Sequence, residues 1–282
     1  MIGFINVNKP VGMTSAQVVA TVKRKLSLDK STKIGHMGTL DMQAGGVLPI
    51  AVGKATRLFD YMLTKRKYYR AEFTFGYMTD SLDSAGEIIN RDDKVIIERQ
   101  VREVLPEFLG DIMQVPPLFS AKKLGGKRAS DIARSGETVD LEACPIHIFR
   151  FDLVSVRGNS FVFDIECSAG TYIRSLCRDL ASSLGTFATM TKLTRTKAGV
   201  FELGNAIELE NVSEECLLPP EVVLVGVPSL NFDTDREMQT LLNGQRLCLD
   251  KPAGIYAFYS MGVLRGLCQI DLEKNAKMKT WL

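Results

Sequence analysis

A glycine-rich segment at residues 35–57, GHMGTLDMQAGGVLPIAVGKATR, contains one histidine, one aspartate and a Gly-Lys pair. Phosphate binding is the first chemistry to test, because the backbone N–H groups of a P-loop wrap phosphate oxygens. A P-loop has four residues between its first glycine and Gly-Lys, followed by Ser or Thr. Here six residues separate Gly46 from Gly53, and Ala55 stands at the Ser or Thr position. A P-loop is therefore excluded, and Asp41 remains the candidate for chemistry.

A loop carboxylate such as Asp41 has two interpretations. It can act as a covalent partner for an electron-poor carbon, or it can only cap a turn, which is the commoner role for a single loop aspartate. Metal binding is not favoured, because the chain has two histidines, far apart, and six cysteines without a CxxC pair. The wide cysteine spacing predicts reduced, mostly buried thiols rather than a zinc site or a disulfide scaffold.

The hydrophobic pattern predicts strands mixed irregularly with helices. Period-2 alternation at 67–77 places Tyr69, Ala71 and Phe73 on one face of a strand. Apolar stripes predict helices that begin near Thr14, cover 101–109 and cover 171–184; further strands are expected at 4–7, 146–156 and 161–168, and in an apolar run whose Pro49 suggests a sheet edge or a bulge. This order is not a regular βαβ alternation, so we expect an α+β fold with a mixed, largely antiparallel sheet flanked by helices.

Two segments break the rhythm of the chain. Residues 110–140 contain prolines, glycines and basic residues, which predicts an inserted, mobile, basic segment with a short helical piece at 130–136. Residues 227–282 contain short β-like pieces separated by glycines. We expect a main domain over residues 1–226 and a small β-rich domain over 227–282.

The charge is segregated rather than large. The net charge is +2, but basic residues cluster at 23–25, 65–70 and 122–128 and around Arg174 and Arg195. Most such clusters are solvated surface, although aromatic residues among basic ones favour a face for RNA. No membrane-length apolar run and no secretory signal pattern is evident, so a cytoplasmic protein without membrane contact is expected.

Four motifs, KPVGMTS, GHMGTLD, KYYRAEFTFGYMTDSLDSAG and CSAGTYIRSLCRDL, occur in this order. Together they closely resemble the TruB family of tRNA pseudouridine synthases over residues 3–220. The segment PPLFSAKKLGGKRASDIARSG is similar to the insertion of the bacterial branch, and the tail resembles a degenerate PUA-type RNA-binding domain. The chain departs from the family at Met42, where Pro is usual, and at Ala169, where Lys is frequent.

The resemblance implies isomerisation of the uridine at position 55 in the T loop of tRNA. The N1–C1′ bond breaks and C1′ rejoins C5 of the base, which requires no cofactor and no metal. Asp41 matches the catalytic aspartate, and its attack on C1′, its attack on the base and a glycal-like route all remain open. The implied partner is the T stem-loop of tRNA, with no obligatory protein partner and a monomeric enzyme.

The resemblance also assigns roles around Asp41. Arg174 matches the arginine that pairs with the catalytic aspartate, and Tyr69 matches the aromatic residue that stacks on the flipped base. His36 matches the residue that takes the vacated place in the RNA. The remaining assignments are Tyr172 and Leu193 as pocket walls, Lys122, Lys123, Lys127 and Arg128 as RNA contacts, and Lys9, Pro10, Gly35, Gly38 and Gly45 as supports of the loop.

Each of these residues has a plain structural alternative. Tyr69, Tyr172 and Leu193 would equally suit a hydrophobic core, His36 a tight turn, and Arg174 the surface of a helix. A competing function is a non-catalytic RNA-binding protein or tRNA-folding chaperone, which would not need the carboxylate of Asp41; a chaperone role beside catalysis is also compatible. The guide-RNA-dependent branch of the family is disfavoured, because its members lack the insertion at 110–140.

Overall fold

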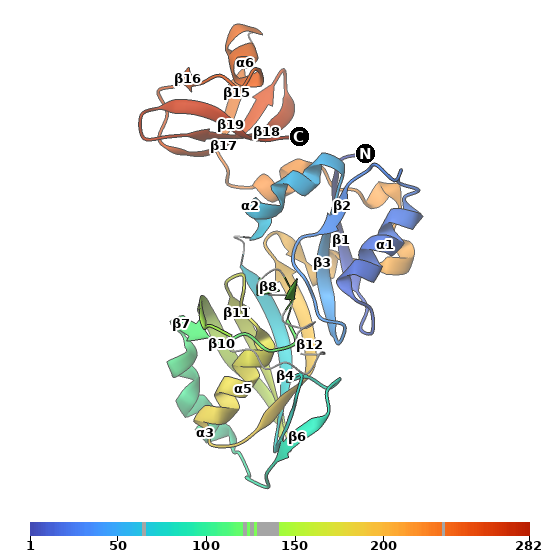
Figure 1. The fold of residues 1–282 in the computed structure, drawn as a ribbon, viewed down its shortest axis with the longest axis vertical. Helices are drawn as coiled ribbons and strands as arrows, with labels where there is room; N and C mark the ends of the chain where they lie inside the picture. The colour runs from blue at the N-terminus through green and yellow to red at the C-terminus, as the bar shows by residue number, and fades with distance from the viewer. Residues whose placement is uncertain (64–65, 121–122, 125–126, 129–140, 233–234) are drawn as a thin grey trace.

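A ten-stranded mixed sheet forms the centre of the protein (Figure 1). The computed structural model describes residues 1–63, 66–120, 123–124, 127–128, 141–232 and 235–282. The strand order is β14-β1-β3-β12-β4-β11-β10-β7, with β2 paired to β3 and β13 paired to β12. Among the described strands of this sheet, only the β1–β14 and β3–β12 pairs are parallel. The expected α+β fold with a mixed, largely antiparallel sheet is confirmed.

The strands of this sheet are β1 (Gly3–Lys9), β2 (Ile34–His36), β3 (Ala44–Val52), β4 (Lys67–Phe75), β7 (Gly110–Gln114), β10 (Cys144–Arg157), β11 (Ser160–Cys167), β12 (Ala188–Ala198), β13 (Phe201–Glu202) and β14 (Ile207–Glu208). Two hairpins stand apart from it, β5 (Tyr77–Thr79) with β6 (Ile88–Arg91) and β8 (Lys123–Leu124) with β9 (Lys127–Arg128). The helices of the body are α1 (Ser15–Lys25), α2 (Phe59–Leu63), α3 (Glu98–Val104) and α5 (Ile173–Ser183), with 3₁₀ turns η1 (Gly53–Leu58), η2 (Leu105–Phe108) and η6 (Pro220–Leu224) among the connections.

One face of the sheet carries the main hydrophobic core. The predicted alternation in β4 is confirmed, since Tyr69, Ala71 and Phe73 are buried while Arg70 between them is exposed. The row of buried side chains in β4 begins two residues earlier than expected, at Lys67, which lies on the same face as Tyr69. Helix α5 contributes its apolar stripe to the same core.

Helix α1 begins where the sequence predicts. Thr14 caps it, its hydroxyl accepting a hydrogen bond from the backbone N–H of Gln17 while the Gln17 side chain accepts one from the N–H of Thr14. This reciprocal capping box satisfies two donors that the first helical turn leaves without partners. The apolar face of α1 is buried through Val18 and Val22.

Two expectations about local structure were wrong. Pro49 does not mark a sheet edge or a break, because β3 runs unbroken over Ala44–Val52 between β1 and the strands β2 and β12. Along one edge, β3 pairs with β12 at residues 44–46 and with β2 at residues 50–52. Pro49 lies between these two paired stretches, so its missing N–H removes no hydrogen bond from the sheet. The helix expected over 101–109 ends at Val104 and continues as η2, because Pro106 cannot continue an α-helix.

The segment expected as an insertion starts with a strand of the main sheet. Strand β7 pairs with β10, from Gly110 opposite Ile148 to Gln114 opposite Cys144. The helical piece expected at 130–136 lies outside the described residues. In the described part of the chain, no helix is long and apolar enough to cross a membrane.

The C-terminal residues form a separate five-stranded sheet of order β15-β17-β18-β19-β16. Its elements are β15 (Ser229–Phe232), α6 (Asp235–Leu242), β16 (Leu247–Cys248), β17 (Gly254–Ser260), β18 (Val263–Ile270) and β19 (Asn275–Trp281). Helix α6 was not predicted from the sequence. Figure 1 shows this sheet at one end of the molecule, with both chain ends near its junction with the body.

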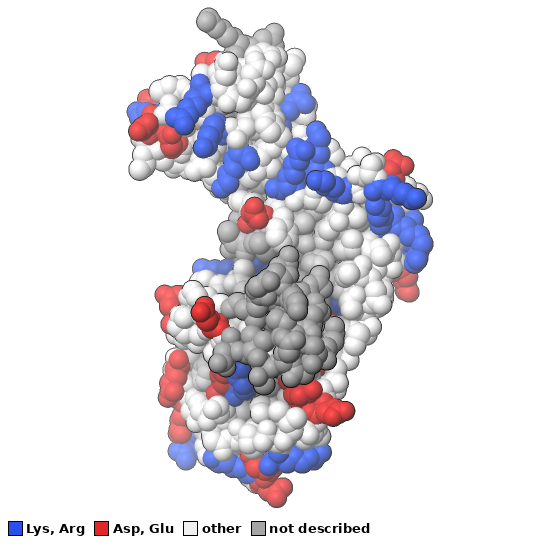
Figure 2. All heavy atoms as spheres, in the orientation of Figure 1, with Lys and Arg blue, Asp and Glu red and all other residues white. Residues whose placement is uncertain are grey.

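Apolar and polar contacts both join the C-terminal sheet to the body. Ala257, Leu264 and Leu267 share a buried hydrophobic cluster with Ala55 and Leu58 of η1. The side chains of Lys54 and Arg57 donate hydrogen bonds to the carbonyl oxygens of Leu282 and Trp281, at 3.1 Å and 2.8 Å respectively. Figure 2 shows lysine and arginine side chains gathered where the two parts meet.

Deleting residues 227–282 should destabilise the remaining body, because the shared cluster loses its C-terminal half and exposes Ala55 and Leu58. We expect a melting temperature lower by about 5 °C or more, since each kcal/mol shifts it by about 2–4 °C at this size. Thermal melting and binding of a hydrophobic dye measure the effect. The full-length variant Lys54→Ala/Arg57→Ala removes only the polar contacts and should melt near the wild type. An unchanged melting temperature of the truncated body would contradict the shared core.

Candidate active site

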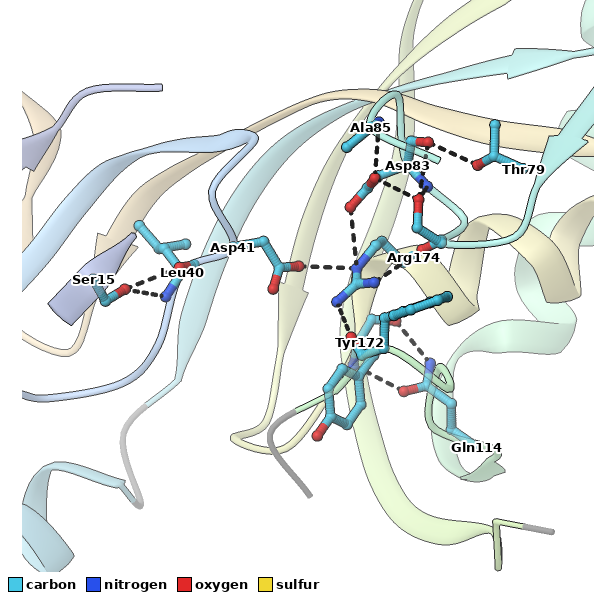
Figure 3. Close-up of polar contacts among 11 residues, drawn as sticks. Ser15, Leu40, Asp41, Thr79, Asp83, Ala85, Gln114, Tyr172 and Arg174 are labelled. Carbon is cyan, nitrogen blue, oxygen red and sulfur yellow. Dashed lines mark hydrogen bonds and ion pairs between the residues drawn. The ribbon is translucent and has the colours of Figure 1, made fainter. Parts of the chain in front are cut away.

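Asp41 and Arg174 meet at a cavity of about 390 Å³ in the body. The Arg174 Nε lies 2.9 Å from an Asp41 carboxylate oxygen (Figure 3). The Arg174 side chain is 5% exposed and that of Asp41 is 38% exposed, so the carboxylate remains open to a ligand. The alternative that Arg174 is a surface charge on α5 was therefore wrong.

Three further groups hold the Arg174 guanidinium in place. Its two terminal nitrogens donate to the carbonyl oxygens of Ser81 and Phe119, both at 2.9 Å. Asp83 lies on the other side, with a carboxylate oxygen 3.8 Å from Nε. A guanidinium presents its donors in a fixed fork, so these acceptors fix its direction as well as its position. The side chain reaches Asp41 in one orientation.

Asp83 was missed by the sequence analysis, which gave it no role. It is 6% exposed, and one carboxylate oxygen accepts hydrogen bonds from the Ser81 hydroxyl at 2.7 Å and the Ala85 N–H at 3.0 Å (Figure 3). Those bonds leave its other oxygen facing Arg174. The signal in the sequence was weak, because nothing in the local pattern separates Asp83 from its acidic neighbours Asp80 and Glu87, which are exposed.

The start of α5 is fixed to strand β7. The Gln114 side-chain amide donates to the Tyr172 carbonyl at 3.1 Å and accepts from the Tyr172 N–H at 2.8 Å. Gln114 is buried, and it satisfies the backbone of the residue just before the helix. This pairing places Tyr172 in the cavity wall and directs Arg174, in the first turn, toward Asp41.

The backbone around Asp41 is held from two directions. The Ser15 hydroxyl, at the start of α1, bonds both the N–H and the carbonyl of Leu40, each at 2.9 Å. The Met42 carbonyl accepts from the Gly12 N–H at 2.8 Å and from the Lys9 ammonium at 3.4 Å. Burial lowers the pKa of Lys9 to about 8, although the Asp41 charge opposes that shift.

Arg195 holds the preceding part of this loop and was also missed. The sequence analysis counted it as part of a basic surface cluster, but it is 1% exposed. Its guanidinium donates to the carbonyl oxygens of Val47 at 2.7 Å, Gly38 at 3.0 Å and Thr39 at 3.3 Å. A buried arginine on β12 thus ties the loop that carries Asp41 to strand β3.

Two glycines of the 35–57 segment occupy backbone conformations that other residues rarely adopt. Gly38 has a φ of +123°, and Gly46 has a φ of +98° with a Cβ that would lie 2.3 Å from the Arg195 carbonyl oxygen. Gly35 and Gly45 have no such φ. The sequence analysis named Gly35, Gly38 and Gly45 as supports of the loop and omitted Gly46.

Tyr69 and Leu193 line the cavity and are 9% and 7% exposed. The core and pocket interpretations are compatible, because β4 and β12 carry the core along most of their length and the cavity at one end. Burial raises the pKa of Tyr69 above its usual value, although the Arg195 charge opposes that shift.

His36 does not join Asp41. It lies on β2 and lines a different, mostly apolar hollow together with Val19 of α1 and Phe59 of α2. Its Nδ1 is buried and has no hydrogen-bond partner among the described residues. Burial, with the Arg195 charge as a smaller cause, lowers the pKa of His36, which favours a neutral ring at physiological pH.

The other predicted residues lie as follows. Pro10 is exposed beside Lys9, and its carbonyl accepts from the Lys9 ammonium at 2.9 Å. Lys123 in β8 and Lys127 and Arg128 in β9 are placed by their backbone alone, and Lys122 lies outside the described residues. Within the described ranges there is no group of three His, Cys, Asp or Glu side chains that could hold a metal ion. The cavity therefore offers a guanidinium-paired carboxylate beside a buried aromatic wall.

Comparison with known proteins gives consistent similarities. The sequence model of the N-terminal domain of TruB family pseudouridylate synthases matches residues 23–173, and that of the tRNA pseudouridylate synthase B C-terminal domain matches residues 174–221. The chain is 39% identical to tRNA pseudouridine synthase B of Clostridium kluyveri, over 86% of this chain and 84% of that protein. It is 41% identical to the protein of the same name from Heliobacterium modesticaldum, over 83% of this chain and 78% of the relative.

Two solved structures share the fold. A chain in the crystal structure of a Cbf5-Nop10-Gar1 complex matches with a TM-score of 0.71 and 26% identity, over 96% of this chain and 79% of that chain. A chain in the structure of an H/ACA RNP bound to a substrate RNA containing 2′-deoxyuridine matches with a TM-score of 0.72 and 23% identity, over 99% and 84% of the two chains. The second likeness shows the fold alone.

Arg195→Met should lower the free energy of unfolding by about 2–4 kcal/mol, because three carbonyl oxygens would lose a charged donor inside the protein. Chemical denaturation with urea measures the change. Lys192→Met, on the same strand, is the matched control: its side chain is 75% exposed and pairs with Glu72, so its loss should cost less than about 1 kcal/mol. Equal free energies of unfolding for the two variants would show that the hydrogen bonds of Arg195 to the loop do not stabilise the protein.

Proposed function

Since the chain belongs to the TruB family of pseudouridylate synthases, we propose that it isomerises the uridine at position 55 in the T loop of tRNA. The observation that carries the proposal is the buried Arg174 guanidinium, 2.9 Å from the more exposed carboxylate of Asp41. The relatives from Clostridium kluyveri and Heliobacterium modesticaldum bear the name tRNA pseudouridine synthase B, which supports tRNA as the substrate.

Asp41 is the group that acts on the reacting nucleoside in this proposal. The target uridine leaves its stack at a cost of a few kcal/mol and enters the cavity. Arg174, held by Asp83 and two backbone carbonyls, aims the Asp41 carboxylate. A carboxylate is a suitable partner for C1′, which develops positive charge as the N1–C1′ bond breaks. Its attack on C1′, its attack on the base and a glycal route all need this same aimed carboxylate.

The cavity walls suit a flat pyrimidine ring. Tyr69 presents a buried aromatic side chain, and Leu193 and Tyr172 line the cavity with it. We propose that Tyr69 stacks on the flipped base and that the other two enclose it. The raised pKa of Tyr69 keeps its hydroxyl protonated at neutral pH, so the phenol can donate a hydrogen bond within the cavity.

The rest of tRNA would contact basic groups outside the cavity. Lys33, Lys54 and Arg57 line one surface hollow at the junction between the body and the C-terminal sheet. We propose that residues 1–226 form the catalytic domain and 227–282 a PUA-like RNA-binding domain, with tRNA also crossing the hollow that holds His36. On sequence grounds, Lys122, Lys123, Lys127 and Arg128 would add phosphate contacts.

Asp41→Asn should abolish pseudouridine formation and leave the Kd for tRNA near the wild-type value. The amide keeps the size of the side chain but lacks the charge and nucleophilicity of the carboxylate. Single-turnover tritium release from tRNA labelled at uridine C5 measures the reaction, beside filter binding. Asp164→Asn is the matched control, since Asp164 pairs with Arg70 on the opposite face of the same sheet and should keep full activity.

Substantial tritium release by purified Asp41→Asn, with host enzyme excluded, would overturn the assignment of Asp41. A tRNA with cytidine at position 55 should release no tritium from its other uridines, which tests the site on the substrate. The same inactive variant separates catalysis from a tRNA-folding role: a chaperone activity would survive Asp41→Asn.

Changing Lys122, Lys123, Lys127 and Arg128 together to Ala should weaken tRNA binding and flatten its salt dependence. Each lost phosphate contact lowers the log–log slope by somewhat under one unit, so the combined fall should reach about two to three units. Filter binding across a salt series gives the slope. A variant with wild-type slope would show that these side chains do not contact phosphate.

A further inference from the structure

Lys67 is a buried cation in the wall of the cavity, and none of the roles above uses it. It is the first residue of β4, is 6% exposed, and shares the inner face of the strand with Tyr69, two residues further along. Cys167 of β11 lies opposite it on one side and Ala198 of β12 on the other. Strands on both sides thus fix its backbone, and its side chain lines the same cavity as Asp41 and Tyr69.

In the described part of the chain, three cations line the cavity: Lys67, Arg174 and Arg195. Arg174 faces the carboxylates of Asp41 and Asp83. Arg195 donates to three backbone carbonyls of the loop. Lys67 lines the same cavity, in which the Asp41 carboxylate already has Arg174 as its counter-ion. Burying an ammonium is costly, and a buried ionisable group in a cleft is a candidate for a functional role.

The proposed reaction creates a negative charge on the base. Attack of Asp41 on the base would itself place negative charge on the ring. When Asp41 instead attacks C1′, or in the glycal route, the N1–C1′ bond breaks and its electron pair goes to the uracil ring. The resulting anion spreads over N1, O2 and O4. It is consumed when C5 forms the new bond to C1′; the C5 hydrogen then leaves as a proton, and N1 gains one. A fixed positive charge beside the ring would stabilise the anion before C5 attacks.

Resting on the proposed function, we propose that the Lys67 ammonium stabilises the uracil anion formed when the N1–C1′ bond breaks, so that Lys67 is a further catalytic residue of this site. Its place favours the base over a phosphate. Lys67 stands two residues from Tyr69, the residue proposed to stack on the base, and it is 6% exposed, whereas a phosphate of bound RNA would favour a solvated position. The ammonium keeps its proton throughout, so no co-reactant is needed.

The protonation state of Lys67 is compatible with this role. Burial, with the Arg195 charge as a second cause, lowers its pKa to about 8, so the ammonium predominates at pH 7 and is lost above pH 8. Among the described residues, the other titratable or charged side chains of this cavity wall are Asp41, Tyr69, Tyr172, Arg174 and Arg195, and Cys167 of β11 lies opposite Lys67. The pKa of Tyr69 is raised, and burial raises that of Cys167 to about 12, so neither changes charge near pH 8.

The first test compares Lys67→Met and Lys67→Arg with the wild type in single-turnover tritium release. Lys67→Met keeps the length of the side chain without the charge and should slow the reaction about 100-fold or more, the range for loss of one such stabilising group. The Kd for tRNA and its salt slope should stay at the wild-type values, and Lys67→Arg should recover most of the rate. Circular dichroism melting confirms that each variant is folded.

Three outcomes would overturn the proposal. A wild-type rate in Lys67→Met would remove Lys67 from the chemistry. A weaker Kd with a flatter salt slope and an unchanged rate at saturating tRNA would make it a phosphate contact. Equal rate losses in Lys67→Met and Lys67→Arg, with lowered melting temperatures, would make it structural. An inactive wild type would instead contradict the proposed function, so the two failures are distinguishable.

The pH dependence gives an independent readout. The wild-type rate should fall above about pH 8 as Lys67 loses its proton, and this fall should weaken or disappear in Lys67→Arg, whose guanidinium stays charged. Lys9 also has a pKa of about 8, so the assignment uses the difference between the two profiles. Lys9→Arg is the matched control and should keep the fall. Identical pH–rate profiles for the wild type and Lys67→Arg would contradict the proposal.

Discussion

The ion pair between Arg174 and Asp41 is the interaction on which the rest of the site depends. Asp41 comes from the loop between β2 and β3, and Arg174 from the first turn of α5, more than a hundred residues later. Neither group reaches the other unless β12 places the two parts of the sheet in register, by pairing with β3 on one side and β4 on the other. The cavity opens along that join, so the fold of the whole body determines the geometry of one carboxylate.

Backbone carbonyl oxygens accept most of the hydrogen bonds that hold the buried cations Lys9, Arg174 and Arg195. Arg174 donates to Ser81 and Phe119, Arg195 to three carbonyls of the loop and β3, and Lys9 to Pro10 and Met42. Such acceptors carry partial charge, so they fix a cation without removing its field. Arg174 also faces the carboxylates of Asp41 and Asp83, which neutralise part of its field. The net result is a rigid cavity with positive walls around one exposed negative group, an arrangement suited to a substrate that is neutral when bound and anionic during reaction.

The sequence predicted the elements better than the charged interior. Alternation in β4, the cap at Thr14 and the apolar stripe of α5 were readable, because apolar periodicity and local capping depend on neighbouring residues. The sequence analysis did not predict that Asp83, Lys67 and Arg195 are buried, because burial of a charge depends on partners that are distant in sequence. Arg195, for instance, is 148 residues from the carbonyl of Val47.

In the candidate site, too, some features were predicted from the sequence and others were not. The resemblance brought Asp41, Tyr69, Tyr172, Arg174 and Leu193 to one cavity, and all five line it. It gave His36 a different role, that of taking the vacated place in the RNA, and the structure places that residue in a separate hollow beside α1. The two positions are five residues apart, but the left-handed turn at Gly38 redirects the chain between them. The sequence shows a glycine in that stretch, but it does not predict the direction in which the chain turns there.

The division between buried and exposed cations also separates two physical tasks. The net charge is only +2, so long-range attraction of a polyanion depends on where exposed lysines and arginines gather, as they do near the junction with the C-terminal sheet. Those charges are screened within about 8 Å at physiological ionic strength. Lys67 and Arg195 lie inside the protein, where screening is weak, but they act only on groups that enter the cavity. Salt should therefore change how tRNA arrives far more than how the bound uridine reacts.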